Sequence, residues 1–238
     1  MAMDSKRRIK SVDVNCRPPE PQLLDTCVLQ NLDWIDRQLE MKGQIVWDDA
    51  ALLSLSTRYG VDTANDLVDL GILYKEFEVL GYYPWLTCKT NFIEVSATRR
   101  ECAATVNDML CFFKGHQEDL SAQTYSGVAL GLLDEVESAR VSPLLLRGLG
   151  VKSVSDVFLC DGPLSFLPDA GDRQIAGSAV LANVPVILTT DRKTFWKHRK
   201  TLSDFGVQVM RPTELLNLYE PYWEALFDEF DLQANKMF

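Results

Sequence analysis

Histidine and paired cysteines are the chemical groups that this chain lacks most clearly. It contains 2 histidines, His116 and His198, which lie too far apart in sequence for an H-E-x-x-H helix and are too few for a site made mainly of imidazole ligands. Its 6 cysteines form no C-x-x-C pair, which excludes a zinc knuckle and a thioredoxin-like redox motif. We therefore expect any bound metal to lie on carboxylates, and we expect the thiols to be reduced and mostly buried.

Long apolar runs and common phosphate-binding motifs are also absent. No uninterrupted run approaches the ~18 residues of a membrane span, and no apolar block follows the basic residues near the start of the chain. The chain contains none of the motifs G-x-G-x-x-G, G-x-x-x-x-G-K-[ST] and G-x-S-x-G. The main sequence signatures of nucleotide-binding loops and of nucleophile-elbow hydrolases are therefore absent. We expect a cytoplasmic protein with no membrane partner.

Positive charge is scarce. The chain has 24 Lys and Arg against 34 Asp and Glu, a net charge of −10, which argues against binding to nucleic acid by bulk positive charge. The bases gather in two short runs, residues 6–10 and residues 192–200, and the second run contains Arg192, Lys193, Lys197, Arg199 and Lys200. This second run is either a solvated face or a local nucleic-acid-binding patch, and its composition fits both.

What the chain does have is material for a core, with 238 residues of which 47% are hydrophobic. Residues 1–21 are polar and interrupted by proline, so we predict an N-terminal arm followed by one folded domain over residues 22–238. Short apolar runs alternate with helical patterns, and strands are expected at residues 23–24, 92–95, 154–160, 184–190 and 207–210. This alternation predicts the α/β class, with a parallel sheet in three layers.

The helical patterns lie between and after these runs. Residues 44–86 are mostly helical by pattern and are interpreted as an inserted helical subregion. Further helices are expected at residues 96–113, with Ser96 as N-cap, and then at residues 117–140, 171–182, 193–202 and 212–238. The helix over residues 193–202 would carry the second basic run, and the last helix would begin at Pro212.

Three acids occur where strands end or helices begin. Asp25 follows the first apolar run, Asp172 opens a helix rich in small residues, and Asp191 follows the nearly continuous β-branched run. Because the carboxyl ends of parallel strands share one edge of a sheet, these side chains can converge there. Converging carboxylates repel one another unless they share a hard cation such as Mg²⁺ or Mn²⁺. Each acid alone also fits an ordinary role as a turn or cap residue.

Four sequence blocks together resemble the PIN-domain ribonucleases. They are LLDTCVL at residues 23–29, SATRRE at 96–101, DAGDRQIAGSA at 169–179 and ILTTDRKTF at 187–195. The last two blocks, with the spacing between Asp172 and Asp191, are the most specific part of this resemblance. The interval from Asp25 to Glu101 is wider than in the small toxin members, and residues 44–86 have no counterpart in the minimal fold.

The resemblance implies a PIN-like domain with a helical insertion that acts as a metal-dependent endoribonuclease. Asp25, Glu101, Asp172 and Asp191 would be the catalytic acids and metal ligands, with Asp169 as a further ligand, around one or two Mg²⁺ or Mn²⁺ ions. Thr189 would support the site or position a water, and the second basic run would bind the RNA substrate. Glu94 and Asp108 compete with Glu101 for its role, although Glu94 is expected to be structural because it projects from a short predicted strand.

The resemblance also implies a biological setting, namely a toxin, a defence protein or a factor in RNA turnover. An inhibitory or regulatory protein partner is expected by analogy, and a homodimer is compatible with it. The alternative is a non-catalytic PIN-like scaffold that binds a protein or nucleic acid. A DNA nuclease of the related flap type would need more acids than these and a helical DNA-gripping motif, which the sequence does not contain.

Overall fold

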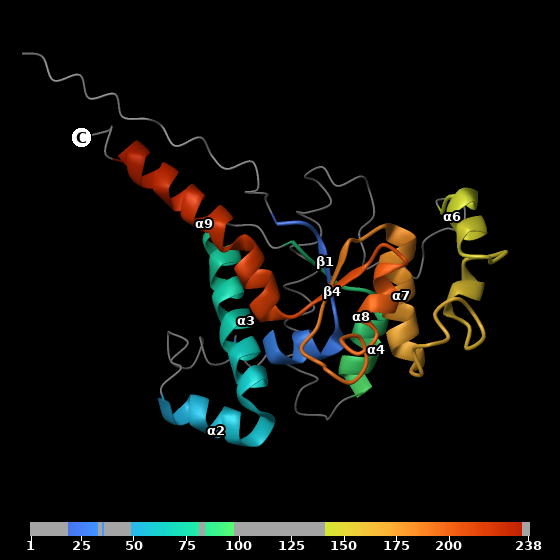
Figure 1. Cartoon of the computed structure of the whole chain (residues 1–238), viewed down its shortest axis with the longest axis horizontal. Helices are drawn as coiled ribbons and strands as arrows, with labels where there is room; N and C mark the ends of the chain where they lie inside the picture. The colour runs from blue at the N-terminus through green and yellow to red at the C-terminus, as the bar shows by residue number, and fades with distance from the viewer. Residues whose placement is uncertain (1–18, 33–34, 36–48, 81–83, 98–140, 235–238) are drawn as a thin grey trace, which may run out of the picture.

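A four-stranded parallel sheet forms the centre of the protein (Figure 1). A computed structural model describes residues 19–32, 35, 49–80, 84–97 and 141–234. The strands are β1 (Gln22–Leu24), β2 (Trp85–Leu86), β3 (Val186–Leu188) and β4 (Gln208–Met210), in the spatial order β2-β1-β3-β4. β1 pairs in parallel with β3, with Leu23 opposite Ile187, and β3 pairs in parallel with β4. The predicted α/β class with a parallel sheet is confirmed.

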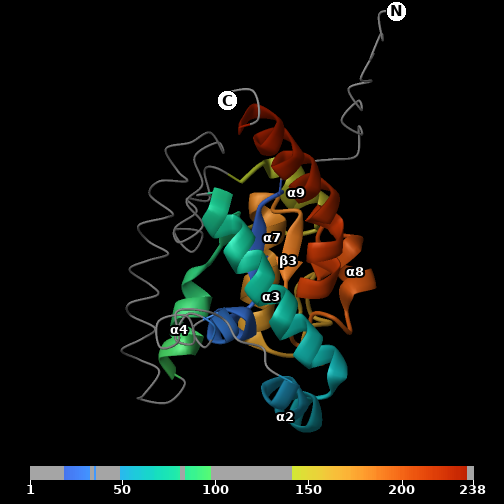
Figure 2. The same cartoon turned by 90° about the vertical axis from the view of Figure 1, so that its left-hand side faces the viewer.

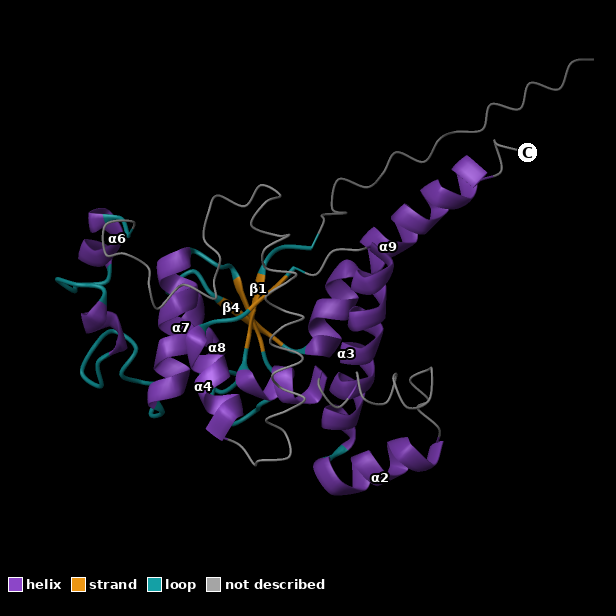
Figure 3. Ribbon diagram, turned by 180° about the vertical axis from the view of Figure 1, so that it is seen from behind, coloured by secondary structure: helices purple, strands orange, loops and turns teal. Residues whose placement is uncertain are grey.

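Helices cover both faces of this sheet. Successive strand residues point to opposite faces, so Leu24 and Leu188 lie in one hydrophobic core and Leu23 and Ile187 lie in another. The first core is closed by α3 (Val61–Leu80), α9 (Pro212–Ala234) and the helix that begins at Thr26. The second is closed mainly by α7 (Ala170–Ala182). Figure 3 shows the three layers, with α3 and α9 on one side of the strands and α4, α7 and α8 on the other.

The range interpreted as an inserted subregion contributes directly to the sheet and to one helical layer. It contains α2 (Asp49–Tyr59), α3 and, at its end, the edge strand β2, which pairs with β1. α3 buries Leu70, Leu73 and Phe77 in the first core and packs along α9 in front of the sheet (Figure 2). The ring of Phe77 lies 5.1 Å from that of Trp85 in β2.

Two predicted strands are wrong. Residues 92–95 lie in the helix α4 (Lys89–Ala97), because Asn91 accepts a hydrogen bond from Cys88 N at 2.8 Å and donates one to Leu24 O at 3.0 Å, which fixes this helix against the end of β1. Residues 154–160 contain the short 3₁₀ helix η2 (Ser155–Phe158). There the carboxylate of Asp156 accepts from the backbone of Lys152 and Ser153, so turn chemistry replaces the expected strand.

Two predicted helices are confirmed and one is largely wrong. α7 ends at Asn183, whose φ of 54° is the left-handed conformation of a helix C-cap, and α9 begins at Pro212 as expected. The predicted basic helix is instead a series of turns over residues 192–198 followed by the short α8 (Arg199–Ser203).

The rest of the chain divides into parts that the structure describes and parts that it does not. A further short helix, α6 (Pro143–Gly148), is capped by the side chain of Ser142. The prediction that Ser96 is the N-cap of a helix over residues 96–113 is wrong, because Ser96 lies within α4 near its C-terminal end. The remainder of that predicted helix, the helix predicted over residues 117–140 and most of the N-terminal arm lie outside the described residues. No helix among the described residues combines the length and the apolar character needed to cross a membrane.

Candidate metal and nucleic-acid site

The two strand-end acids are joined by one hydroxyl group. Asp25 directly follows β1 and is 6% exposed, and Asp191 follows β3, so both acids leave the central strands at the same edge of the sheet. Thr189 Oγ1 donates to Asp25 Oδ2 at 2.6 Å and accepts from Asp191 N at 2.9 Å. Thr189 therefore positions Asp25 relative to the chain at Asp191.

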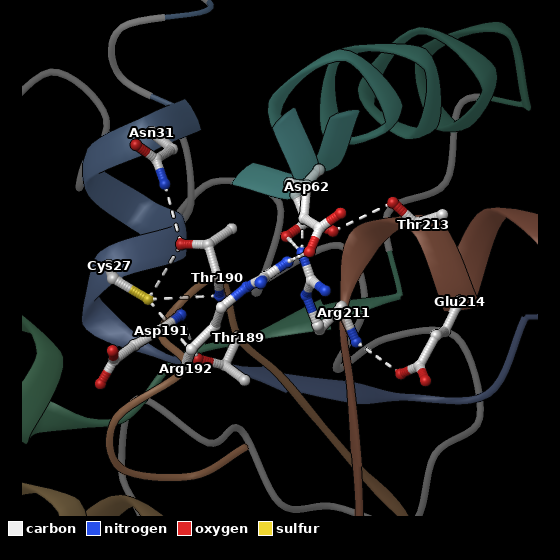
Figure 4. A network of polar contacts seen from close by, with 11 residues as sticks. Cys27, Asn31, Asp62, Thr189, Thr190, Asp191, Arg192, Arg211, Thr213 and Glu214 are labelled. Carbon is white, nitrogen blue, oxygen red and sulfur yellow. Dashed lines mark hydrogen bonds and ion pairs between the residues drawn. The ribbon is translucent and has the colours of Figure 1, made fainter. Parts of the chain in front are cut away.

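A second donor fixes the same carboxylate oxygen. Cys27 Sγ donates to Asp25 Oδ2 at 2.9 Å. Thr190 Oγ1 in turn donates to Cys27 Sγ at 3.1 Å, and Asn31 Nδ2 donates to Thr190 Oγ1 at 2.9 Å (Figure 4). Burial raises the pKa of the Cys27 thiol well above its ordinary value, which keeps the sulfur protonated and able to donate. Burial also raises the pKa of Asp25, although the hydrogen bonds from Cys27 and Thr189 act to lower it. The carboxylate thus has one fixed orientation.

Asp169 and Asp172 lie at the N-terminus of α7. Asp169 Oδ1 accepts from Gly171 N at 2.7 Å and from Asp172 N at 3.4 Å, which makes Asp169 the N-cap of this helix. Asp169 is predicted to be a metal ligand by the resemblance, but its observed hydrogen bonds stabilise the start of the helix.

The carboxyl group of Asp172 is strongly perturbed. It is half-buried, and its pKa is raised to about 7, first by burial and then by repulsion from other acids. In order of size, this repulsion comes from Asp25, Asp169, Glu94 and Asp191. The carboxylates of Asp25, Glu94, Asp169, Asp172 and Asp191 are therefore close enough to act on one another, and we call this set the acid edge.

Glu94 belongs to the acid edge through a direct contact with the chain that follows β1. It lies in α4, and its Oε2 accepts a hydrogen bond from Thr26 Oγ1. Burial raises its pKa, and repulsion from Asp25 and Asp169 acts in the same direction. The expectation that Glu94 is a strand residue with a purely structural role rested on the strand over residues 92–95, which is wrong. Glu101 and Asp108 lie outside the described residues, so the role assigned to Glu101 stays a prediction.

A helical pattern could have identified Glu94 from the sequence. If residues 89–97 are taken as a helix, Asn91 and Glu94 are three positions apart and share one face. The structure uses that face, because Asn91 Nδ2 bonds Thr26 Oγ1 at 3.2 Å and Glu94 bonds the same hydroxyl.

Asp191 also has an ordinary structural role. Its Oδ1 accepts from Lys193 N at 2.9 Å, and its Oδ2 accepts from Thr194 N at 3.2 Å and from Thr194 Oγ1 at 2.7 Å. These bonds begin the series of turns after β3. Each carboxylate oxygen has two lone pairs, so these contacts leave one acceptor position open on Oδ1 and use both positions on Oδ2.

The basic residues after Asp191 do not share one helix face. Arg192 forms an ion pair with Asp62 in α3, with 2.7 Å between Nη2 and Oδ2. Arg199 lies over the ring of Trp196, 4.2 Å from its centroid, and donates to Trp196 O at 3.0 Å. The exposed members of the run also include Lys193, Lys197 and Lys200. Their binding to nucleic acid stays a prediction.

The donor chemistry of the acid edge fits a hard divalent cation. All of its side chains offer carboxylate oxygens, which Mg²⁺ and Mn²⁺ prefer as ligands. The pKa of Asp172 is raised partly by the negative charge of the other acids, and a bound cation would offset that charge. No three His, Cys, Asp or Glu side chains in the described part of the chain form a ready-made metal cage. When no cation is shared, the repulsion between carboxylates opposes their close approach, and a cage of three such side chains needs that close approach.

Comparisons with known proteins give no relative for this chain. No family model matches it, and neither the curated proteins nor the solved structures include a match. The resemblance to PIN-domain ribonucleases therefore depends on the sequence blocks alone. Any function of the acid edge has to be inferred from the contacts and charges of its own side chains.

Proposed function

We propose that this protein is a metal-dependent endoribonuclease of the PIN type, which hydrolyses RNA phosphodiester bonds. The observation that carries the proposal is the hydroxyl of Thr189, which ties Asp25 to the chain at Asp191 at the carboxyl edge of the two central strands. Ligands in open α/β sheets bind at this edge. Glu94 and Asp172 add two further carboxylates, whose mutual repulsion favours a bound cation.

Asp25, Glu94, Asp172 and Asp191 would hold Mg²⁺ or Mn²⁺, with Glu101 and Asp169 as further candidates. When bound, the ion would lower the pKa of a water molecule and offset the charge that develops on the phosphate. Cys27 and Thr189 hold Oδ2 of Asp25, which sets the direction of this carboxylate before any ligand arrives. The carboxyl of Asp172, with its pKa of about 7, gives up its proton as a cation binds.

A cleavage panel tests this function. The purified full chain is incubated with single-stranded RNA, duplex RNA and single-stranded DNA in Mg²⁺, in Mn²⁺ and in EDTA. We expect internal cleavage of RNA that requires the divalent ion and disappears in EDTA. The Asp172→Asn variant, purified in parallel, controls for contaminating nucleases. Cleavage that persists in EDTA or in this variant, or no cleavage in either metal, would reject the proposal.

A non-catalytic scaffold is the second candidate, and the hydrogen bonds of two acids favour it. Asp169 caps α7, and Asp191 accepts three hydrogen bonds from the turn that follows it. If the acids serve only such local roles, the protein binds RNA or a protein without cleaving it. The same cleavage panel, combined with a Mn²⁺ titration, separates the two candidates because a scaffold would bind Mn²⁺ weakly and non-stoichiometrically.

Gly171 offers a test of the position of Glu94. A Cβ atom at residue 171 would overlap Glu94 Oε1, so Gly171→Ala has to displace this carboxylate. The displaced atom ends a flexible side chain, and alanine in a helix is favoured over glycine by ~1 kcal/mol, so we expect no loss in the free energy of unfolding. We expect cleavage to fall by about tenfold, corresponding to ~1.4 kcal/mol of transition-state stabilisation.

Thermal unfolding and initial cleavage rates measure the two effects separately. The matched control is Gly148→Ala in α6, where an added Cβ meets nothing within 4 Å. This control should retain the full rate. Equal rates for Gly171→Ala and the wild type would mean that the carboxylate of Glu94 is not needed where the structure places it.

A further inference from the structure

Arg192 directly follows Asp191 of the acid edge, and its guanidinium is engaged within the protein. It pairs with Asp62 at 2.7 Å, and both side chains are open to solvent, with exposed fractions of 39% for Arg192 and 66% for Asp62 (Figure 4). The guanidinium of Arg192 holds the pKa of Asp62 below its usual range, so Asp62 is charged at neutral pH. The carboxylate of Asp62 thus neutralises the guanidinium of Arg192, the residue that directly follows Asp191.

A second arginine fixes the backbone beneath this pair. Arg211, which follows β4, forms a buried ion pair with Asp66, and Asp66 Oδ1 also accepts from Thr213 Oγ1 at 3.0 Å. Arg211 Nη2 donates to the backbone oxygen of Asp62 at 3.0 Å as well. The first turns of α3 are therefore held by buried contacts that do not involve Arg192, and Asp62 stays in place when Arg192 leaves it.

The two ion pairs differ in how easily they break. Removal of one partner from a buried pair leaves an uncompensated charge, whereas an exposed pair contributes only ~0–1 kcal/mol. A phosphate group offers the planar guanidinium two parallel hydrogen bonds and more negative charge than a single carboxylate. Arg192 can therefore exchange Asp62 for a phosphate at little energetic cost, while Arg211 cannot leave Asp66.

We propose that Asp62 is an internal substitute for a substrate phosphate: it holds Arg192 in the free protein and releases it to an RNA phosphate. This inference rests on the proposed function, because RNA is the ligand that would carry the phosphate. It gives α3 a role in substrate entry as well as in the core. It predicts that Asp62 lowers the affinity for RNA, and that it does so only through Arg192.

A double-mutant cycle tests the exchange. Fluorescence anisotropy measures the Kd of the full chain for a labelled single-stranded RNA 20-mer in EDTA, so that cleavage does not interfere. We expect Asp62→Asn to tighten binding by about 2–5-fold, which matches the release of ~0.4–1 kcal/mol from an exposed pair. Arg192→Gln should weaken binding and reduce the log–log salt slope by about 0.7, the value for one phosphate contact on a single strand.

The double variant Asp62→Asn/Arg192→Gln shows whether Asp62 acts on RNA binding through Arg192. Asp62→Asn should have no effect in the Arg192→Gln background, because no cation is then left to release. Asp69→Asn, on the same helix, removes the same charge and serves as the matched control, with a Kd close to that of the wild type. The exchange is rejected if Asp62→Asn and Asp69→Asn tighten binding equally, if the gain persists in the double variant, or if the RNA does not bind.

The proposed function can fail independently of this exchange. A chain that shows the expected binding cycle but no metal-dependent cleavage would keep the exchange and lose the hydrolytic activity. A chain that cleaves RNA in Mg²⁺ but binds equally well with and without the Asp62 carboxylate would keep the activity and lose the exchange. Both substituted side chains are exposed, so the variants are expected to unfold within about 2 °C of the wild type.

Discussion

Asp172→Asn should abolish Mn²⁺ binding and reduce RNA cleavage by at least about 100-fold, a loss of ~3 kcal/mol of transition-state stabilisation. The substitution keeps the shape of the side chain and removes the charge that the other acids repel. In EDTA at pH 8 the variant should be more stable than the wild type, by ~1–3 kcal/mol once partial exposure is allowed for. Isothermal titration with Mn²⁺, cleavage rates and thermal unfolding measure these three effects.

The raised pKa of Asp172 also predicts how the free energy of unfolding changes with pH. The pKa of Asp172 is raised from 3.8 to about 7 in the folded protein, so the native state binds more protons than the unfolded chain between these values. The free energy of unfolding in EDTA should therefore fall as the pH rises through this window and level off above it. Asp172→Asn should flatten this part of the curve.

Divalent ions and an exposed acid provide the controls for Asp172→Asn. Mn²⁺ in hundredfold excess over its Kd should stabilise the wild type by ~2.7 kcal/mol and leave the variant unchanged. Asp161→Asn, in the exposed turn before α7, should behave as the wild type in every assay. An unchanged Mn²⁺ affinity in Asp172→Asn would remove Asp172 from the metal site.

Glu94→Gln should reduce cleavage by about 10–100-fold while the protein stays folded. The amide keeps a group that can accept from Thr26 Oγ1, but it removes one of the negative charges that raise the pKa of Asp172. The pKa of Asp172 should consequently fall in this variant, because repulsion from Glu94 is one of its causes. Cleavage rates and the pH dependence of thermal unfolding in EDTA measure the two effects.

Comparison with Glu101→Gln decides which glutamate serves the site. The sequence blocks predict that loss of Glu101 leaves a residual activity that high Mn²⁺ partly restores, whereas the structure places Glu94 at the acid edge. Glu220→Gln, an exposed change of the same type in α9, controls for the loss of one charge. Wild-type activity in Glu94→Gln together with an inactive Glu101→Gln would return the role to Glu101.

The elements that could be predicted from the sequence are those with a strong local signal. The run of β-branched residues before Asp191 forms β3, and the small-residue helix after Asp169 forms α7 with its cap, because burial on both faces and helix capping each leave a mark in the sequence. The two residues of β2 are too few to show a period. They become a strand only because they pair with β1.

The misassigned elements are those in which tertiary contacts override local preference. Phe92, Ile93 and Val95 favour a strand by residue type, but Asn91 ties this stretch to Leu24 O and holds it as helix α4. After Asp191 the chain forms turns over residues 192–198 in place of the expected helix, although the carboxylate of Asp191 accepts from the backbone of residues 193 and 194 as a helix N-cap would. The error at residues 92–95 carried over to the site, because the structural role expected for Glu94 rested on that strand.

The hydrogen bond from Thr189 to Asp25 joins residues 164 positions apart, and this separation has a consequence for the newly made chain. β1 and α3 leave the ribosome early, but α7, β3 and Thr189 follow only when most of the protein has been synthesised. A contact of such long range forms late in folding, after the large loop between its partners has closed. A truncated or stalled chain that ends before Thr189 would therefore contain Asp25 without an organised acid edge.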